Sequence, residues 1–205
     1  MRAPDADVKA VQRAERELGR APMPKQDKSK SRQDYETPPS FITAVAQRFG
    51  PLFYDLAATA ANAKARNFIT PERDAFTVNW ARELGEGLGW LNSPFANLRP
   101  WVQKCRDEMA IGARILQLTP ASVGSEWFGD LVYGCAGVQV LYVAPRITFV
   151  GETTPYPKDI LLLVWDRRFE HATGRWNFTE QAVRFDECRR DFDYAARGDA
   201  VGEPG

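Results

Sequence analysis

Residues 88–95 read Leu88-Gly89-Trp90-Leu91-Asn92-Ser93-Pro94-Phe95, and the architecture expected for the whole chain follows from them. The first four residues form a short apolar run, which is typical of a buried strand. The next residues, Asn, Ser and Pro, favour a turn. Pro94 fixes its own φ and biases Ser93 toward an extended conformation, so the Ser93 carbonyl is held in a set direction. The stretch therefore predicts a buried strand that ends in a polar turn.

The turn at residues 92–95 offers an amide oxygen, a carbonyl and an aromatic face, which match a flipped-out base with an exocyclic amine. Such an amine is a poor nucleophile because its lone pair is delocalised into the ring. If the Asn92 side-chain oxygen and the Ser93 carbonyl each accept one amino hydrogen, the lone pair is localised, while Phe95 stacks on the ring. We therefore predict amino-group methylation. The alternative is a plain turn after a strand, for which the same residues suffice.

Upstream of this stretch, residues Leu52 to Leu56 form a second short apolar run, which predicts a buried strand that feeds a loop. Asp55 falls at the end of this strand, as Asn92 does in the other. In doubly wound sheets, ligands collect at the carboxyl ends of the strands. We therefore expect Asp55 and Asn92 to be neighbours in one site.

The remaining periodic segments alternate between helices and strands, which predicts a mostly parallel α/β sheet flanked by helices. An amphipathic helix is expected to begin at Pro38 and Pro39, with Thr37 as its cap, and to stop at Gly50. Further helices are expected over residues 99–110, 127–133 and 180–194, and further strands over residues 113–118, 138–143 and 160–165.

The chain of 205 residues, 44% of them hydrophobic, is long enough for one domain with tails. We place the domain at residues 34–195, a disordered basic tail at 1–33 with a transient helix over 8–18, and a loose end at 196–205. The formal net charge is zero, but residues 1–33 carry nine Lys or Arg against five Asp or Glu. That tail is either a solvated leader or an arm that touches DNA.

Several classes of protein are disfavoured by what the chain contains. The three cysteines, Cys105, Cys135 and Cys188, are widely spaced and match no metal motif, which fits a reducing cytosol. His171 is the only histidine, so hydrolytic triads and histidine-based zinc sites are not expected. We expect His171 itself to lie in an exposed loop. The longest apolar run, Ile160–Trp165, is too short to cross a bilayer. We therefore predict a soluble cytoplasmic protein without metal.

Several sequence blocks, taken in order, make the chain resemble the phage-type DNA N6-adenine methyltransferases. The blocks are Asp34-Tyr35-Glu36-Thr37-Pro38, the segment Phe53 to Arg66 with Asn62-Ala63-Lys64, Asp74-Ala75-Phe76 with Trp80, the 92–95 turn, Trp101 with Lys104, residues 116–121, Trp127, and residues 146–149. The resemblance covers residues 34 to 166. The family's turn usually has Pro and Tyr where this chain has Ser93 and Phe95, but a carbonyl and a ring face remain.

The resemblance implies a Rossmann-like S-adenosylmethionine-dependent methyltransferase. It implies that Asp55 pairs with the ammonium group of S-adenosylmethionine, that Asp74 accepts a hydrogen bond from its adenine amine, and that Phe76 packs against that ring. It also implies that Thr37 and Pro38 line the methionine end. Asp55 and Asp74 have an alternative role as helix caps or solvated charges.

By resemblance, the partner is double-stranded DNA, and the biological use is modification of phage or prophage DNA against host restriction in the bacterial cytoplasm. Two alternatives stay open: methylation of another planar amine, such as cytosine N4 or a protein glutamine, and a catalytically silent DNA-binding or decoy protein. Arg146 and Lys104 either contact phosphates or are solvated charges. Trp101 and Trp127 are expected in the core.

Overall fold

The computed structural model describes residues 35–185, so the predictions for residues 1–33 and 196–205 lie outside the described part. The elements, in chain order, are α2 (Pro39–Phe49), β1 (Leu52–Asp55), β2 (Asn67–Phe68), the 3-10 helix η2 (Pro71–Arg73), α3 (Trp80–Leu84), β3 (Leu88–Leu91), α4 (Leu98–Ala110), β4 (Arg114–Pro120), α5 (Glu126–Leu131), β5 (Val138–Ala144), β6 (Ile160–Trp165), β7 (Ala172–Asn177) and β8 (Ala182–Phe185).

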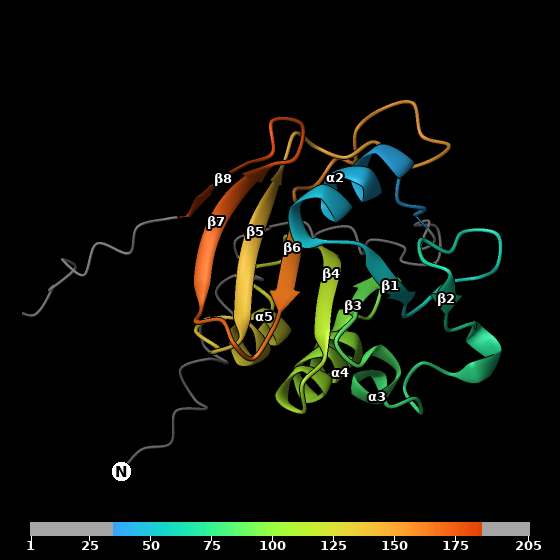
Figure 1. Cartoon of the computed structure of the whole chain (residues 1–205). Coiled ribbons are helices and arrows are strands. Elements are labelled where there is room, and N and C mark those ends of the chain that lie inside the picture. Colours follow the sequence, from blue (N-terminus) through green and yellow to red (C-terminus); the bar gives the residue numbers. More distant parts are fainter. Residues whose placement is uncertain (1–34, 186–205) are drawn as a thin grey trace, which may run out of the picture. The chain divides into compact units, whose positions relative to one another are not determined.

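The strands of the described region form one eight-stranded sheet in the order β2-β1-β3-β4-β6-β5-β7-β8 (Figure 1). Strands β2, β1, β3 and β4 are parallel neighbours, and β5 pairs with β7 in parallel. The exceptions are β6, which is antiparallel to both β4 and β5, and the edge strand β8. Six of the eight strands therefore run in one direction, and the predicted mostly parallel sheet is confirmed.

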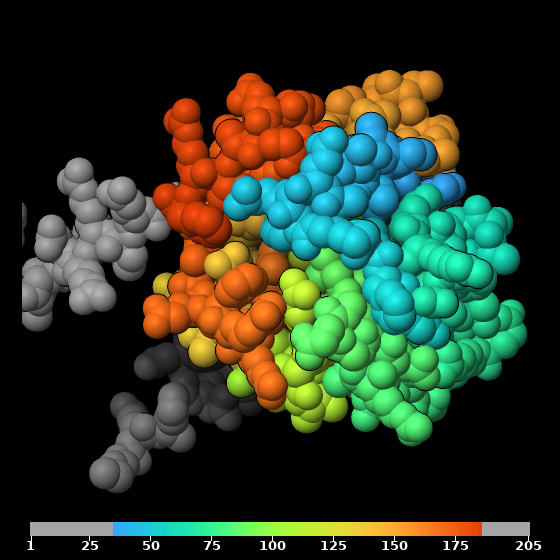
Figure 2. Space-filling view, viewed as in Figure 1, coloured from blue at the N-terminus to red at the C-terminus, as the bar shows by residue number. Residues whose placement is uncertain are grey.

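Helices cover both faces of the sheet, which explains why its central strands β3, β4 and β6 are largely apolar and buried. On one face, Phe41, Ala44 and Val45 of α2 pack on a cluster that includes Trp90. On the other face, α3, α4 and α5 pack on a second cluster that includes Leu91. Figure 2 shows the atoms of α2, in light blue, on the surface of the molecule on the side that faces the viewer. Strand β6 is buried along its whole length, as expected for a central strand covered on both faces.

Most of the elements expected from the sequence are present. The helices predicted over residues 99–110 and 127–133 correspond to α4 and α5, and the strands predicted over 113–118, 138–143 and 160–165 correspond to β4, β5 and β6. The helix expected over 180–194 is wrong where the structure describes it, because residues 182–185 form β8. Thr37 does not cap α2: the cap position is Pro38, and no side chain caps it.

Further observations concern the classes of protein that the sequence disfavoured. Among the helices of residues 35–185, none combines the length and the apolar character that a membrane span requires. Cys105 and Cys135 are free thiols, and Cys188 lies outside the described residues. His171 lies in a loop before β7, as predicted, but it is only partly exposed, and its ring contacts Tyr133 edge to face.

Candidate active site

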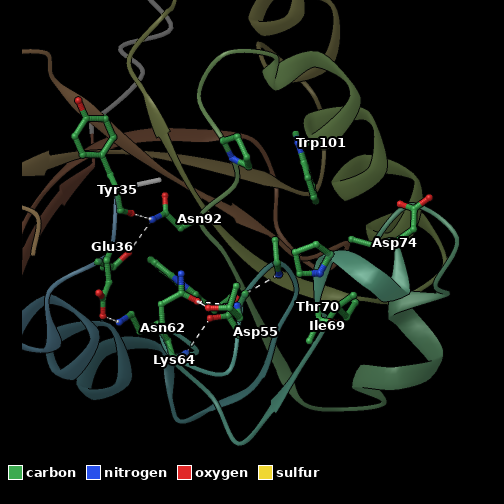
Figure 3. Close-up of a pocket in the computed structure, with 18 of the residues that line it drawn as sticks. Tyr35, Glu36, Asp55, Asn62, Lys64, Ile69, Thr70, Asp74, Asn92 and Trp101 are labelled. Carbon is green, nitrogen blue, oxygen red and sulfur yellow. Dashed lines mark hydrogen bonds and ion pairs between the residues drawn. The ribbon is translucent and has the colours of Figure 1, made fainter. Parts of the chain in front are cut away.

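A cavity of about 460 Å³ opens at the carboxyl ends of β1 and β3. Strands β1 and β3 are adjacent and parallel, with Asp55 opposite Trp90, so the residues that follow them meet at one edge of the sheet. In Figure 3, Tyr35 and Asn92 lie on one side of the cavity, Asp74 and Trp101 lie on the other, and Asp55 lies between them. Asp55 and Asn92 both line this cavity, so the two residues are neighbours, as the strand pattern predicts.

Asn92 is held by the segment that precedes α2. Its side-chain nitrogen donates hydrogen bonds to the Tyr35 carbonyl at 2.6 Å and to the Thr37 hydroxyl at 3.1 Å. A primary amide has two N–H groups and one carbonyl oxygen, so both N–H groups are used within the protein. The group that this side chain can still offer to a ligand is therefore its oxygen, which is an acceptor.

Asp55 is a buried carboxylate, 3% exposed, at the end of β1. One of its oxygens accepts from the Lys64 backbone N–H at 2.9 Å and the other from the Ala57 backbone N–H at 3.3 Å. Burial raises the pKa of the Asp55 carboxyl above its ordinary value, and the two N–H groups counteract part of this rise. The loop after β1 thus wraps around an acid that still borders the cavity.

The opposite end of the cavity is built from Asp74, Phe76 and Trp101. Asp74 has a φ of 50°, and its carboxylate accepts from the Phe76 backbone N–H at 3.1 Å. The Phe76 and Trp101 rings are 4.4 Å apart between centroids. The buried indole N–H of Trp80 donates to the Ala75 carbonyl at 2.9 Å, which ties this loop to the start of α3. This end offers aromatic surface beside an acceptor.

The charges around the cavity are mainly acidic. Glu36, Asp55 and Asp74 line it together with a single cation, Lys64. The ammonium group of Lys64 is paired with Glu36 at 2.7 Å. Such a lining disfavours phosphate-bearing ligands and favours a ligand with a cationic group. Within residues 35–185, no group of three or more His, Cys, Asp or Glu side chains is placed to hold a metal ion.

Six of the nine residues singled out from the sequence line the cavity: Thr37, Asp55, Asp74, Phe76, Asn92 and Pro94. The other three, Pro38, Ser93 and Phe95, are not part of this lining. Ser93 is 2% exposed, and its hydroxyl has no partner among the described residues. The Phe95 ring stacks on Tyr35 at 5.9 Å and contacts Phe149 and Tyr156 edge to face, so it belongs to an aromatic cluster beside the cavity.

The structure also places the residues whose roles the sequence left open. Lys104 forms an ion pair with the buried Glu108 and lies over the Trp80 ring. Arg146 forms an exposed ion pair with Asp159 at 3.0 Å. Trp127 lies in the core as predicted, but the prediction for Trp101 is incomplete because Trp101 also lines the cavity.

Sequence reasoning missed several contributors to the site. Tyr35 and Glu36 stand inside the block that also contains Thr37, and Lys64 stands inside Asn62-Ala63-Lys64. Both blocks carried the family resemblance, so their polar residues were available as candidates. Thr70 and Pro71, which also line the cavity, gave no comparable signal.

The chain has the features of the class of Rossmann-like methyltransferases: a mostly parallel sheet with helices on both faces, an acid at the end of β1 and an Asn-Ser-Pro-Phe turn after β3. Residues 25–171 match the sequence model of the DNA N-6-adenine-methyltransferase (Dam) family, which is more than half of the chain. The chain therefore belongs to this family of adenine-specific DNA methyltransferases.

Individual proteins are similar to the chain as well. A DNA N-6-adenine-methyltransferase of Haemophilus phage HP1 (strain HP1c1) is 26% identical over 136 residues, covering 64% of this chain and 75% of that protein. A predicted O-methyltransferase from Agrobacterium tumefaciens is 14% identical with a TM-score of 0.36, covering 66% of this chain and 85% of that one. A chain from a type I R-M system is 13% identical with a TM-score of 0.44, covering 68% of this chain and 44% of that one.

Proposed function

We propose that this adenine-specific DNA methyltransferase takes its methyl group from S-adenosylmethionine and acts on an adenine flipped out of double-stranded DNA. The observation that carries the proposal is the state of Asn92, whose two N–H groups are used inside the protein while its side chain borders the cavity. An orientation of this kind selects a target that donates hydrogen bonds, and an exocyclic amine is such a target.

The cavity residues fit the proposed donor. When bound, S-adenosylmethionine supplies a methyl group on a sulfonium centre, and its amino-acid part carries an ammonium group. Asp55 is the acceptor for that ammonium group, and Asp74 accepts from the donor's purine amine beside Phe76. The acidic lining supports a cationic ligand, and a volume of about 460 Å³ lies within the range of small-molecule sites. Pro38 is proposed to lie at the methionine end, and Thr37 either lies there with it or acts through its hydrogen bond to Asn92.

On the target side, Asn92 and Ser93 hold the amine of the flipped adenine. The Asn92 side-chain oxygen accepts one amino hydrogen and the Ser93 carbonyl accepts the other, which directs the nitrogen lone pair out of the ring plane. Pro94 restricts the direction of the Ser93 carbonyl. Phe95 supplies a ring from the aromatic cluster beside the cavity, against which the base stacks. The rate then comes from groups that are in position before the base arrives.

The test is the Asn92→Ala variant assayed on duplex DNA. We expect methyl transfer to fall by about 100-fold or more, because one of two preorganised acceptors is lost. Calorimetry should show that the variant still binds S-adenosylmethionine. Asn67→Ala is the matched control, because Asn67 also donates through its side chain to a backbone carbonyl but does not line the cavity. Full activity of Asn92→Ala would remove the proposed role.

Nucleoside analysis of the methylated DNA separates the remaining alternatives. N6-methyladenine is the expected product, whereas N4-methylcytosine would show that the same turn serves another planar amine. A wild-type chain that binds DNA but neither binds the donor nor transfers methyl groups would instead be a silent binding protein. The biological role that we propose is modification of phage or prophage DNA against restriction in the host cytoplasm, which the similarity to the phage HP1 protein supports.

A further inference from the structure

Residues Tyr35, Glu36 and Thr37, here called the strap, precede α2 and reach the loops that follow three different strands. The strap contacts Asn92 after β3 through the Tyr35 carbonyl and the Thr37 hydroxyl. It contacts the loop after β1 through the ion pair between Glu36 and Lys64. It contacts the loop after β5 because the Glu36 carbonyl accepts from the Val150 N–H at 3.0 Å. The strap is thus anchored independently of Asn92.

The strap decides which end of the Asn92 amide is offered to a ligand. Both strap groups accept hydrogen bonds from the Asn92 nitrogen, at 2.6 Å and 3.1 Å. A half-turn of the amide would bring its oxygen to the same distance from the Tyr35 carbonyl oxygen, and two acceptors so close repel each other. The observed orientation is therefore the one in which the oxygen stays available.

Burial makes Thr37 difficult to replace in this role. Thr37 is 1% exposed, so water is not at hand to take over its hydrogen bond. The Tyr35 ring packs against Phe95 and Phe149, with centroid distances of 5.9 Å and 5.0 Å. This packing holds the Tyr35 carbonyl in place. Both acceptors of the Asn92 amide thus belong to a segment that is held by packing contacts of its own.

We infer that Thr37 is a positioning residue that acts through Asn92. The strap accepts two hydrogen bonds at position 92, so the side chain required there is an amide and not an acid. This inference rests on the proposed function, in which the Asn92 oxygen accepts from the target amine. It assigns Thr37 a different role from contact with the methionine end of the donor. The two roles differ in what a Thr37 substitution changes: turnover in the first case and donor affinity in the second.

Substitution of Thr37 tests the role directly. Thr37→Val keeps the shape but removes the acceptor, and we expect kcat to fall by about tenfold, the equivalent of one hydrogen bond, with the donor Kd unchanged. Thr37→Ser retains the hydroxyl and should restore most of the rate. Thr43→Val is the matched control, because Thr43 is exposed on α2 and its hydroxyl donates only to the Pro39 carbonyl. A weaker donor Kd with unchanged kcat in Thr37→Val would overturn the inference.

A second variant, Asn92→Asp, tests the requirement for an amide. An ionised carboxylate at this position would face the Tyr35 carbonyl oxygen without a proton to donate, so we expect a large loss of rate at pH 8. Lowering the pH should restore part of the rate relative to the wild type, because a protonated carboxyl can donate to that carbonyl. The other charged groups that line the cavity are Glu36, Asp55, Lys64 and Asp74. A wild-type rate at pH 8 would refute the requirement.

A measurement without DNA keeps the inference separate from the proposed function. In an NMR experiment on the full chain, both side-chain amide protons of Asn92 should exchange more slowly with water than those of the exposed Asn67. In Thr37→Val, one of the two should exchange faster. If the Asn92 protons exchange as fast as those of Asn67 in the wild type, the strap does not hold the amide. If they are protected but the wild type transfers no methyl group, the proposed function fails and the positioning stands.

Discussion

The two ends of the cavity differ in how firmly their polar groups are held. At the Asn92 end, the side-chain amide donates two hydrogen bonds to the strap, and Thr37 is 1% exposed. At the Asp74 end, the carboxylate accepts from the N–H two residues further on, and the Phe76 ring is 42% exposed. In the proposed function, the target side is thus prepared before any ligand arrives, whereas the donor side presents accessible surfaces.

This difference assigns different kinetic roles to the two ends. Groups that are fixed in advance lower the barrier of the chemical step, because no reorganisation is needed when charge develops. Groups that are exposed and locally held contribute mainly to binding. Substitutions at the Asn92 end should therefore lower turnover, and substitutions at the donor end should lower donor affinity. Asp55 is buried between the two ends. Its negative charge matches the proposed donor, whereas its burial is like that of the groups at the Asn92 end.

The largest effect at the donor side is expected for Asp55→Asn. In the proposed function, removing the charge weakens the hydrogen bond to the donor's ammonium group, so we expect the Kd for S-adenosylmethionine to rise roughly 10- to 100-fold. Asn keeps one oxygen for the Lys64 or Ala57 N–H, so the loop after β1 should still close. Calorimetry measures the change. Asp107→Asn, an exposed substitution on α4, is the control, and equal donor affinity in the two variants would exclude Asp55 from the donor site.

The central part of the fold was predictable because its strands are apolar runs bounded by turn residues. Strand β6, Ile160–Trp165, is buried along its length and stands out in the sequence for that reason. Strand β7 does not: of its residues, Gly174 and Trp176 are buried, and the rest are polar or partly exposed. Strand β7 is stabilised by long-range contacts, namely its pairing with β5 and the contact of Trp176 with Phe41 of α2. No local sequence pattern therefore predicts this strand. The charged segment that follows has helical propensity, which tertiary pairing overrides in β8.

The site was predictable to the extent that it follows from strand order. Asp55 ends β1 and Asn92 follows β3, and parallel neighbours bring such residues together. The link between Thr37 and Asn92 joins residues 55 positions apart and depends on where α2 begins. A Thr before two prolines has the pattern of a helix cap, and only the start of α2 one residue later frees its hydroxyl for Asn92.

A smaller effect is expected for Phe76→Ala. Loss of the ring removes contact with the donor's purine, and we expect the donor Kd to rise about three- to tenfold while kcat at saturating donor stays unchanged. Phe185→Ala is the matched control, since Phe185 is 41% exposed on the edge strand β8 and lies outside the cavity lining. A fall in kcat without a change in Kd would mean that this end takes part in the chemical step, and the contrast between the two ends would disappear.

The pH dependence of donor binding tests whether the buried Asp55 carboxylate is the charge that the donor meets. Burial raises the pKa of this carboxyl, so it takes up a proton at a higher pH than an exposed acid does. If the charged form binds the ammonium group as proposed, donor affinity should decrease as pH falls through the raised pKa, by at most about tenfold per pH unit. Asp55→Asn should bind weakly with no such decrease. If the wild type and Asp55→Asn lose affinity in parallel on acidification, another group is responsible, and the buried acid then contributes to the fold of the loop after β1 and not to the charge that the donor meets.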